Sequence, residues 1–204
     1  ILKKYIEGYY DKTLDELVQD HFYQSLGANY TTYNPSSKFS DENIVPTEID
    51  DYFKYQKIQG YVHDMGAAMQ NGVGGHAGVF SNANDVAKIM QMYLQKGYYG
   101  GQRYFKTETI DKFNTCYFCT KNNRRGIGFD KPQLGDDGPT CGCVSMTSFG
   151  HSGFTGTYAW ADPDEDIVYI FLSNRTYPNA NNNVLLKEGI RTEIQRLIYE
   201  AIIE

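Results

Sequence analysis

Residues 149–157 form the densest group of side chains in this sequence that could do chemistry. They read Phe-Gly-His-Ser-Gly-Phe-Thr-Gly-Thr and include His151 and Ser152. Glycines let a ligand lie against backbone N–H groups, while imidazole and hydroxyl groups can donate or carry protons. We therefore interpret the segment as a candidate binding and proton-transfer site. The alternative is that the glycines only permit a bulge and that His151 is a buried, satisfied core histidine.

The same residues come close to the Gly-x-Ser-x-Gly motif of a nucleophile elbow. That motif needs a glycine two residues after the serine and a helix beyond it, whereas Phe154 follows here and leads into a β-like pattern. Ser152 is therefore not expected to be a nucleophile of that kind.

A second glycine-rich segment, Gly-Val-Gly-Gly-His-Ala-Gly at residues 72–78, stands shortly before a helical pattern. A glycine-rich turn that feeds a helix can cradle a phosphate. However, no Gly-Lys-Ser or Gly-Lys-Thr ending follows, and no strand-like run precedes the glycines. Close packing of the backbone is therefore the favoured interpretation over phosphate binding.

The four cysteines are arranged as Cys116-x-x-Cys119 and Cys141-x-Cys143. A zinc ribbon requires two Cys-x-x-Cys knuckles, and here the second is one residue short. A metal site is thus the least favoured interpretation. Surface disulfides and free thiols both remain open from the spacing.

Composition excludes several classes of protein. The chain has 204 residues, 41% of them hydrophobic, and a formal net charge of −6. It is therefore expected to fold around a core rather than be disordered, and it is not expected to bind nucleic acid. No run approaches the roughly 18 apolar residues of a membrane span, and no signal sequence opens the chain. Because Ile1 already stands inside a helical pattern without a capping residue, we expect a truncated chain.

The helices are indicated by capping residues and by apolar residues spaced three and four apart. Thr13-Leu-Asp-Glu16 predicts a capping box and a helix that ends at Gly27. Further helices are expected after Ser81 or Asn82, at residues 107–113, and as one long amphipathic helix across the sheet at residues 186–201. Residues 28–60 lack periodicity and predict a long ordered loop.

The strands are indicated in the second half of the chain. Residues 126–129 and 154–161 are β-like, with Tyr158 and Trp160 expected on one face. The apolar run at residues 167–172 predicts a central, doubly covered strand that pairs antiparallel with the one before it. The expected class is α+β, an antiparallel sheet flanked by helices, with residues 1–204 in a single domain.

Two parts of the sequence together resemble the serine β-lactamase-like hydrolases, which include class C β-lactamases, D-Ala-D-Ala carboxypeptidases, D-aminopeptidases and related esterases. Residues 150–157, followed by Trp-Ala-Asp-Pro at 160–163 and Phe-Leu-Ser-Asn-Arg at 171–175, are similar to the C-terminal signature of that family. Val-His-Asp at 62–64 and the segment 74–85 are similar to the His-Asp and Gly-Gly-x-Ala-Gly-x-Phe-Ser segment of the same family. The resemblance implies a β-lactamase/transpeptidase-like fold that is incomplete at the N-terminus.

The resemblance also implies roles for the candidate site. That family carries a Lys-Thr-Gly triplet, often replaced by His-x-Gly, on the strand beside its nucleophile, and His151, Ser152 and Gly153 match it. His151 is then the catalytic residue, and Ser152, Gly153, Phe154 and Thr155 bind substrate or the oxyanion, with the Phe154 backbone N–H as one oxyanion donor. We expect this triplet at the start of an inner strand, facing a groove. No metal and no cofactor is implied.

Two family motifs are missing. No lysine has a serine three residues before it, so the nucleophilic Ser-x-x-Lys is absent. Tyr177-Pro-Asn179 follows the predicted central strand, whereas the family's tyrosine motif lies upstream of the region that corresponds to Ile1. The resemblance therefore implies the C-terminal portion of a larger serine acyl hydrolase that acts on a D-amino-acid peptide, a β-lactam or a small ester. Its partners are a small-molecule or cell-wall peptide substrate and the missing N-terminal part, in the bacterial periplasm or otherwise outside the cytoplasm.

The alternative is a non-catalytic module that binds peptidoglycan or a partner on a degenerate β-lactamase fold. The extracytoplasmic location that the resemblance implies also bears on the cysteines, because thiols oxidise there. We expect a disulfide between one of Cys116 and Cys119 and one of Cys141 and Cys143.

Overall fold

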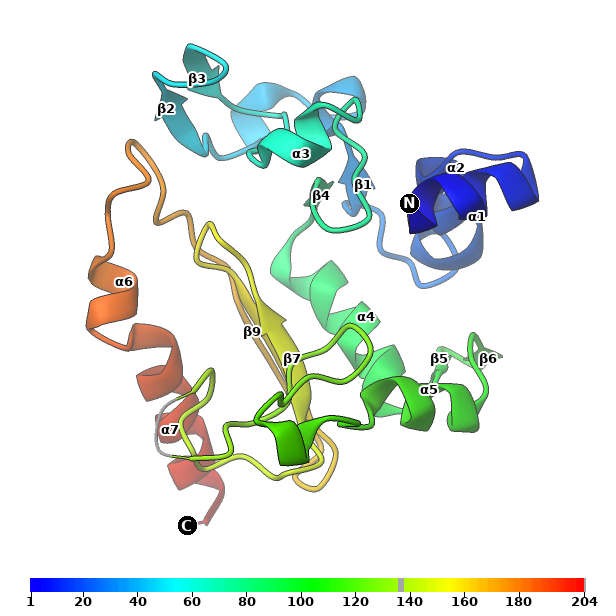
Figure 1. The fold of residues 1–204 in the computed structure, drawn as a ribbon, viewed down its shortest axis with the longest axis vertical. Coiled ribbons are helices and arrows are strands. Elements are labelled where there is room, and N and C mark those ends of the chain that lie inside the picture. Colours follow the sequence, from blue (N-terminus) through cyan, green and yellow to red (C-terminus); the bar gives the residue numbers. More distant parts are fainter. Residues whose placement is uncertain (136–137, 204) are drawn as a thin grey trace. The chain divides into compact units, whose positions relative to one another are not determined.

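The computed structural model describes residues 1–135 and 138–203, and the chain divides into two compact units (Figure 1). The first unit consists of residues 1–86 and 174–182, and the second of residues 87–173 together with the chain from residue 183 onward. Among the described residues, no helix is both long enough and apolar enough to cross a membrane.

The first unit opens with two helices, α1 (Leu2–Tyr10) and α2 (Leu14–Val18). The predicted capping box is confirmed: the Glu16 backbone N–H donates to Thr13 Oγ1 at 3.3 Å, and the Thr13 backbone N–H donates to Glu16 Oε2 at 2.8 Å. A π-helical turn, Gln19–Tyr23, continues α2. Gly27 follows with a φ of +65°, the left-handed conformation expected at the end of this helical run.

The predicted long loop at residues 28–60 is wrong in part, because it contains three short strands. They belong to two antiparallel pairs: β1 (Thr32–Tyr33) with β4 (Val79–Phe80), and β2 (Glu48–Asp50) with β3 (Gln56–Ile58). Each of them has two or three residues, which is too short for an alternating pattern to be recognised. Two 3₁₀ turns, Pro35–Ser37 and Asp41–Asn43, complete the segment.

The glycine-rich segment at residues 72–78 is packed closely, as the favoured interpretation predicts. A Cβ on Gly78 would lie 2.2 Å from the carbonyl oxygen of Gly72, and both glycines have positive φ. The segment lies between α3 (Met65–Ala68) and β4. The next helix, α4 (Ala83–Leu94), begins where Asn82 Oδ1 accepts the Asp85 backbone N–H at 2.9 Å, so Asn82 is its cap.

The second unit is built on a three-stranded antiparallel sheet in the order β7-β8-β9. This arrangement confirms the expected α+β class with an antiparallel sheet and helices. The strands are β7 (Phe149–Ser152), β8 (Tyr158–Asp162) and β9 (Ile167–Phe171). The unit also contains most of α4, the helices α5 (Thr107–Asn114), α6 (Val184–Lys187) and α7 (Ile190–Ile203), a 3₁₀ turn, Cys119–Lys121, and the hairpin of β5 (Tyr98–Tyr99) and β6 (Gln102–Arg103).

Several strand predictions need correction. The pairing of residues 167–172 with the preceding strand is confirmed, but β8 is the central strand, and β9 lies at the edge of this sheet with mostly half-buried side chains. β8 begins at Tyr158 instead of Phe154, because Gly153–Thr157 form the turn between β7 and β8, closed by the Gly153 N–H and the Thr157 carbonyl at 2.8 Å. Residues 126–129 form no strand and are flanked by a single β-bridge between Arg125 and Asp130.

The core of the second unit lies between the sheet and the C-terminal helix. Tyr158 and Trp160 share one face of β8, as predicted, and their rings stack with centroids 5.5 Å apart. Ile194 and Ile198 of α7 pack against this cluster. The predicted long helix therefore does cover the sheet, although it is interrupted between α6 and α7 at Gly189, which has a φ of +57°.

Asp162, at the end of β8, is fully buried and holds three parts of the second unit together. Its carboxylate accepts hydrogen bonds from the Ser145 backbone N–H at 2.8 Å, the Ser145 hydroxyl, the Asp164 N–H at 3.2 Å and the Tyr199 hydroxyl of α7 at 2.6 Å. Burial alone would raise the pKa of Asp162, but these hydrogen bonds outweigh it and hold the pKa below its ordinary value. The ionised carboxylate is therefore part of the folded structure.

Replacing Asp162 with Asn is expected to lower the free energy of unfolding at neutral pH by about 2 kcal/mol, because charge-assisted hydrogen bonds are lost. A carboxyl whose pKa is lowered by folding stabilises above its unfolded pKa, and this contribution disappears as the pH falls through the folded pKa. Thermal unfolding between about pH 5 and about pH 2 should thus depend less on pH in Asp162→Asn than in the native chain. The control is Asp164→Asn, at an exposed position of the same turn. Equal pH slopes for native chain and Asp162→Asn would contradict this account.

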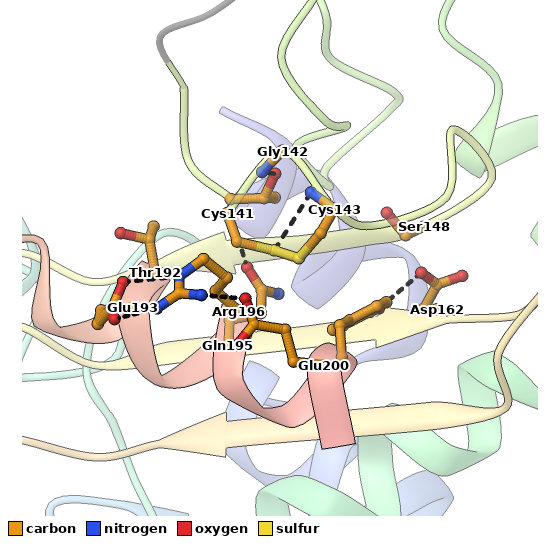
Figure 2. Close-up of a disulfide and its surroundings, with 12 residues drawn as sticks. Cys141, Gly142, Cys143, Ser148, Asp162, Thr192, Glu193, Gln195, Arg196 and Glu200 are labelled. Atoms are coloured by element: carbon orange, nitrogen blue, oxygen red, sulfur yellow. Dashed lines mark hydrogen bonds and ion pairs between the residues drawn. A yellow bond between two sulfur atoms is a disulfide. The ribbon is translucent and has the colours of Figure 1, made fainter. Parts of the chain in front are cut away.

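The predicted disulfide between the two cysteine pairs is wrong. The bonds join Cys116 to Cys119 and Cys141 to Cys143, so each pair closes on itself and all four cysteines are oxidised. Zinc binds cysteine as the thiolate, which a disulfide does not provide. Figure 2 shows the Cys141–Cys143 bond above α7, where the Cys141 backbone N–H donates to Gln195 Oε1 at 3.0 Å.

Candidate functional site

The His-Ser-Gly segment lies at the turn end of the hairpin formed by β7 and β8. His151 and Ser152 are the last residues of β7, paired with Ala159 and Tyr158, and Gly153 begins the turn. The triplet thus ends an edge strand of the sheet, which corrects the prediction that it starts an inner strand. That it faces a groove stays a prediction.

The side chains of this segment are accessible to solvent. His151 is exposed, Phe154 is 63% exposed, and Ser152 and Thr155 are half-buried. The alternative that His151 is a buried core histidine is therefore wrong. What the sequence places together at this strand end is an imidazole, two hydroxyl groups and an accessible stretch of backbone.

The glycines of the segment are required by packing. A Cβ on Gly150 would lie 2.2 Å from the Ala159 carbonyl oxygen and 2.3 Å from Trp160 Cε3, and a Cβ on Gly153 would lie 2.2 Å from Thr157 Oγ1. Since the backbone and the buried indole cannot yield, Gly150 has a structural role in the hairpin. The case for a functional site therefore depends on His151, Ser152 and the backbone beyond them rather than on the number of glycines.

His151 is held by two hydrogen bonds that fix its ring. Arg125 Nη1 lies 2.9 Å from His151 Nε2, and the ring Nδ1 lies 2.7 Å from the Ser152 carbonyl oxygen. Both ring nitrogens are therefore engaged. The imidazole is a pre-oriented group, in contrast to a freely rotating surface histidine.

Arg125 is in turn held by Asp130, a buried carboxylate beside β7. Arg125 Nε is 3.2 Å from Asp130 Oδ1, and Arg124 Nη2 is 3.3 Å from Asp130 Oδ2. The backbone of Asp130 exchanges two hydrogen bonds with Gly150, of 2.8 and 3.1 Å, which brings the segment against the strand next to His151. A carboxylate, a guanidinium and an imidazole thus lie in a row at this strand end.

Sequence reasoning missed Arg125 and Asp130. Arg125 is separated from His151 by 26 positions, and neither Arg125 nor Asp130 belongs to a recognisable motif. The only local signal is two adjacent arginines followed within six residues by an aspartate, a pattern that is usual on protein surfaces. The contact depends on the β-bridge between Asp130 and Gly150, which the sequence does not indicate.

The histidines of the other family-like segment have structural partners within the first unit. His63 Nε2 lies 2.7 Å from Oε2 of the buried Glu48, whose other oxygen accepts the Ala180 N–H at 3.0 Å. Glu48 Oε2 also accepts the Tyr52 hydroxyl at 3.1 Å, and burial followed by this carboxylate raises the pKa of Tyr52 to about 12. This cluster joins segment 174–182 to the rest of the first unit.

His76, in the glycine-rich segment, is exposed and bonded to a helix cap. Its Nε2 lies 2.9 Å from Asp64 Oδ1, the same oxygen that accepts the Ala67 N–H of α3 at 2.7 Å. The Ala67 hydrogen bond, and then His76, lower the pKa of Asp64, although burial opposes them. Asp64 is therefore ionised at neutral pH and caps α3 while it orients His76.

Solved structures share this fold. Simvastatin synthase from Aspergillus terreus matches with a TM-score of 0.66 at 15% identity over 97% of this chain and 51% of its own. A beta-lactamase from Mycobacterium bovis matches with a TM-score of 0.63 at 16% identity over 100% of this chain and 60% of its own. At these identities the likeness concerns the fold alone, and it defines a β-lactamase/transpeptidase-like α+β protein.

The chain belongs to the beta-lactamase family, because the model of that family matches residues 1–189. A protein of Escherichia coli (strain K12) described as "Putative D-alanyl-D-alanine carboxypeptidase" is 32% identical over 88% of this chain and 45% of its own length. A protein of Salmonella agona with the same description is also 32% identical, over 91% of this chain and 47% of its own length. The chain therefore spans about half the length of the curated relatives it matches.

Proposed function

We propose that this chain supplies the wall of a serine acyl-hydrolase site that carries the His151-Ser152-Gly153 triplet. The observation that supports this most directly is the accessible end of β7, where a fixed imidazole stands beside exposed backbone. Backbone N–H groups held rigidly at a strand end stabilise the oxyanion of acyl transfer without reorganisation. Membership of the beta-lactamase family supports the same class of reaction.

Each residue of the segment has a proposed role. The backbone N–H of Phe154 donates to the developing oxyanion, and Gly153 leaves room for the acyl group. Ser152 and Thr155 hydrogen-bond the substrate, and His151 is the catalytic group of the triplet. These roles require the residues to be accessible, and they are exposed or half-buried.

The proposed substrate is a peptide that ends in D-alanine. The relatives described as D-alanyl-D-alanine carboxypeptidases, at 32% identity, favour an amide substrate over a β-lactam or an ester. Such peptides belong to bacterial peptidoglycan, so the proposed location is periplasmic or otherwise outside the cytoplasm.

The nucleophile is proposed to come from the part of the family domain that this chain does not span. The sequence has no Ser-x-x-Lys, and the chain covers less than half of each of these two relatives. The match to the family model takes in residues of both units, which supports assigning residues 1–204 to a portion of one hydrolase domain.

The test uses the whole protein that carries this chain together with the remaining half of the domain. His151→Ala is expected to lower kcat/KM for release of D-alanine from a D-Ala-D-Ala peptide by about 100-fold, because a positioned proton-transfer or hydrogen-bonding group is lost. His21→Ala, at an exposed position of the first unit, is the control and should change the rate by less than about twofold.

Full activity of His151→Ala would overturn the proposed role of the triplet. A whole protein that releases no D-alanine but binds the peptide, with binding lost in His151→Ala, would instead establish the non-catalytic module as the function.

A further inference from the structure

We propose that Arg125 is a positioning residue for His151, which holds the neutral imidazole in the tautomer with its proton on Nδ1 and supplies the positive charge beside the triplet. The importance of this arrangement for a reaction rests on the function proposed above. The tautomer itself does not, and it can be measured separately.

The hydrogen-bonding capacity of the three groups defines the tautomer. A guanidinium has only donors, so His151 Nε2, 2.9 Å from Arg125 Nη1, must accept. A carbonyl oxygen only accepts, so Nδ1, 2.7 Å from the Ser152 carbonyl, must donate. A doubly protonated ring would direct an N–H at the guanidinium and place two like charges together. The contact therefore selects the neutral ring with its proton on Nδ1.

Arg125 is anchored so that it can impose this choice. Its Nε is ion-paired with Asp130 at 3.2 Å, and the Asp130 side chain is buried. Two backbone hydrogen bonds fasten Asp130 to Gly150, the residue directly before His151. Arg125 is thus attached, through Asp130, to the same strand that carries His151. A shift of that strand would move the guanidinium and the imidazole together.

The arrangement changes what the triplet offers to a substrate. With Nε2 accepting from Arg125, His151 presents no acidic N–H at that nitrogen, and the positive charge at the strand end belongs to the guanidinium. Arg125 has a half-exposed side chain, and its guanidinium carries the cationic charge of this site. A fixed cation next to the strand end favours the negative charge that develops there during acyl transfer. In this triplet, the charge that a lysine would carry is provided by a neighbouring segment.

Arg124 offers a matched control within the same chain. It is adjacent in sequence and binds the other oxygen of the same carboxylate, Asp130 Oδ2, at 3.3 Å. The hydrogen bond to His151 comes from Arg125. Removing either arginine takes one charge from Asp130, and removing Arg125 also takes away the contact with the imidazole, so the two variants should differ at His151.

The decisive experiment measures the tautomer of His151 by long-range ¹H–¹⁵N correlation in the ¹⁵N-histidine-labelled chain at about pH 8, where an ordinary imidazole is neutral. The native chain is expected to show a protonated Nδ1 and an unprotonated Nε2. In Arg125→Ala the proton should redistribute toward Nε2, Arg125→Lys should keep it on Nδ1, and Arg124→Ala should leave the native pattern unchanged. A protonated Nε2 in the native chain, or an unchanged tautomer in Arg125→Ala, would overturn the proposal. The native spectrum decides the matter even if a variant fails to fold.

A kinetic cycle in the whole protein tests the positioning role separately. If Arg125 acts through His151, Arg125→Ala should lower kcat/KM about tenfold, and adding it to His151→Ala should cost nothing further. Fully additive losses would contradict the positioning role. A native His151 with its proton on Nε2, combined with activity that depends on His151, would overturn this inference and leave the proposed function intact.

Discussion

The 204-residue chain by itself is expected not to hydrolyse a chromogenic β-lactam or a p-nitrophenyl ester above the background rate. The sequence has no Ser-x-x-Lys, in which one helical turn brings a lysine amine against the nucleophilic hydroxyl. Without an activated nucleophile, covalent catalysis loses several powers of ten, on the order of 10⁴ to 10⁶ in kcat, and only binding and oxyanion stabilisation remain. Initial rates with the purified chain, compared with buffer and with the whole protein, measure this difference.

The chain also contains the residue that would explain an opposite result. Ser152 lies half-buried at the end of β7 and is the only hydroxyl within the triplet. Turnover by the isolated chain that disappears in Ser152→Ala would identify Ser152 as the nucleophile. It would contradict the proposal that the nucleophile comes from the part of the domain that this chain does not span. The matched control is Ser145→Ala, whose hydroxyl bonds the buried Asp162 and not the triplet.

The helices could be predicted because their signals are local. Thr13 and Glu16 form the capping box from side chains three positions apart, and Asn82 caps α4 through Asp85 in the same way. Such contacts depend on neighbours in sequence alone. The short strands β1 to β4 carry no comparable signal, since each pairs with a segment that the sequence does not identify.

The position of a strand within the sheet is not local either. The run from Ile167 to Leu172 has the continuous apolar character typical of a central strand, yet β9 lies at the edge of the sheet in this chain. Its apolar side chains are half-buried. A continuous apolar run therefore does not by itself tell whether a strand is central or at an edge of its sheet.

The candidate site also contains residues that the sequence indicates and residues that only the fold reveals. The triplet could be recognised because its residues are consecutive, whereas Arg125 and Asp130 reach His151 only through the β-bridge to Gly150. The disulfides were mispredicted for a related reason, because sequence spacing gives no distance between the two cysteine pairs. Motifs thus indicate which side chains a site contains, and the folded chain determines what fixes their orientation.

Replacing Trp160 with Ala is expected to lower the free energy of unfolding by about 3 to 5 kcal/mol, the cost typical of deleting a buried aromatic side chain. Trp160 is 1% exposed, stacks on Tyr158 with the two rings 6° from parallel, and its Nε1 donates to Ser148 Oγ at 3.0 Å. The truncation leaves a cavity between the sheet and α7 and removes that hydrogen bond. Because Trp160 is the only tryptophan, urea unfolding of the variant must be followed by far-ultraviolet circular dichroism.

Leu197→Ala provides the comparison, because Leu197 belongs to the same helix that covers Trp160 but is 52% exposed. It should cost less than about 1 kcal/mol, since little apolar surface is lost from the interior. Trp160→Phe should lie between the two, as the smaller ring keeps part of the contact with Tyr158 but leaves Ser148 without its indole donor. A loss below about 1 kcal/mol for Trp160→Ala would mean that α7 does not depend on this cluster to cover the sheet, and the core assigned to the second unit would be wrong.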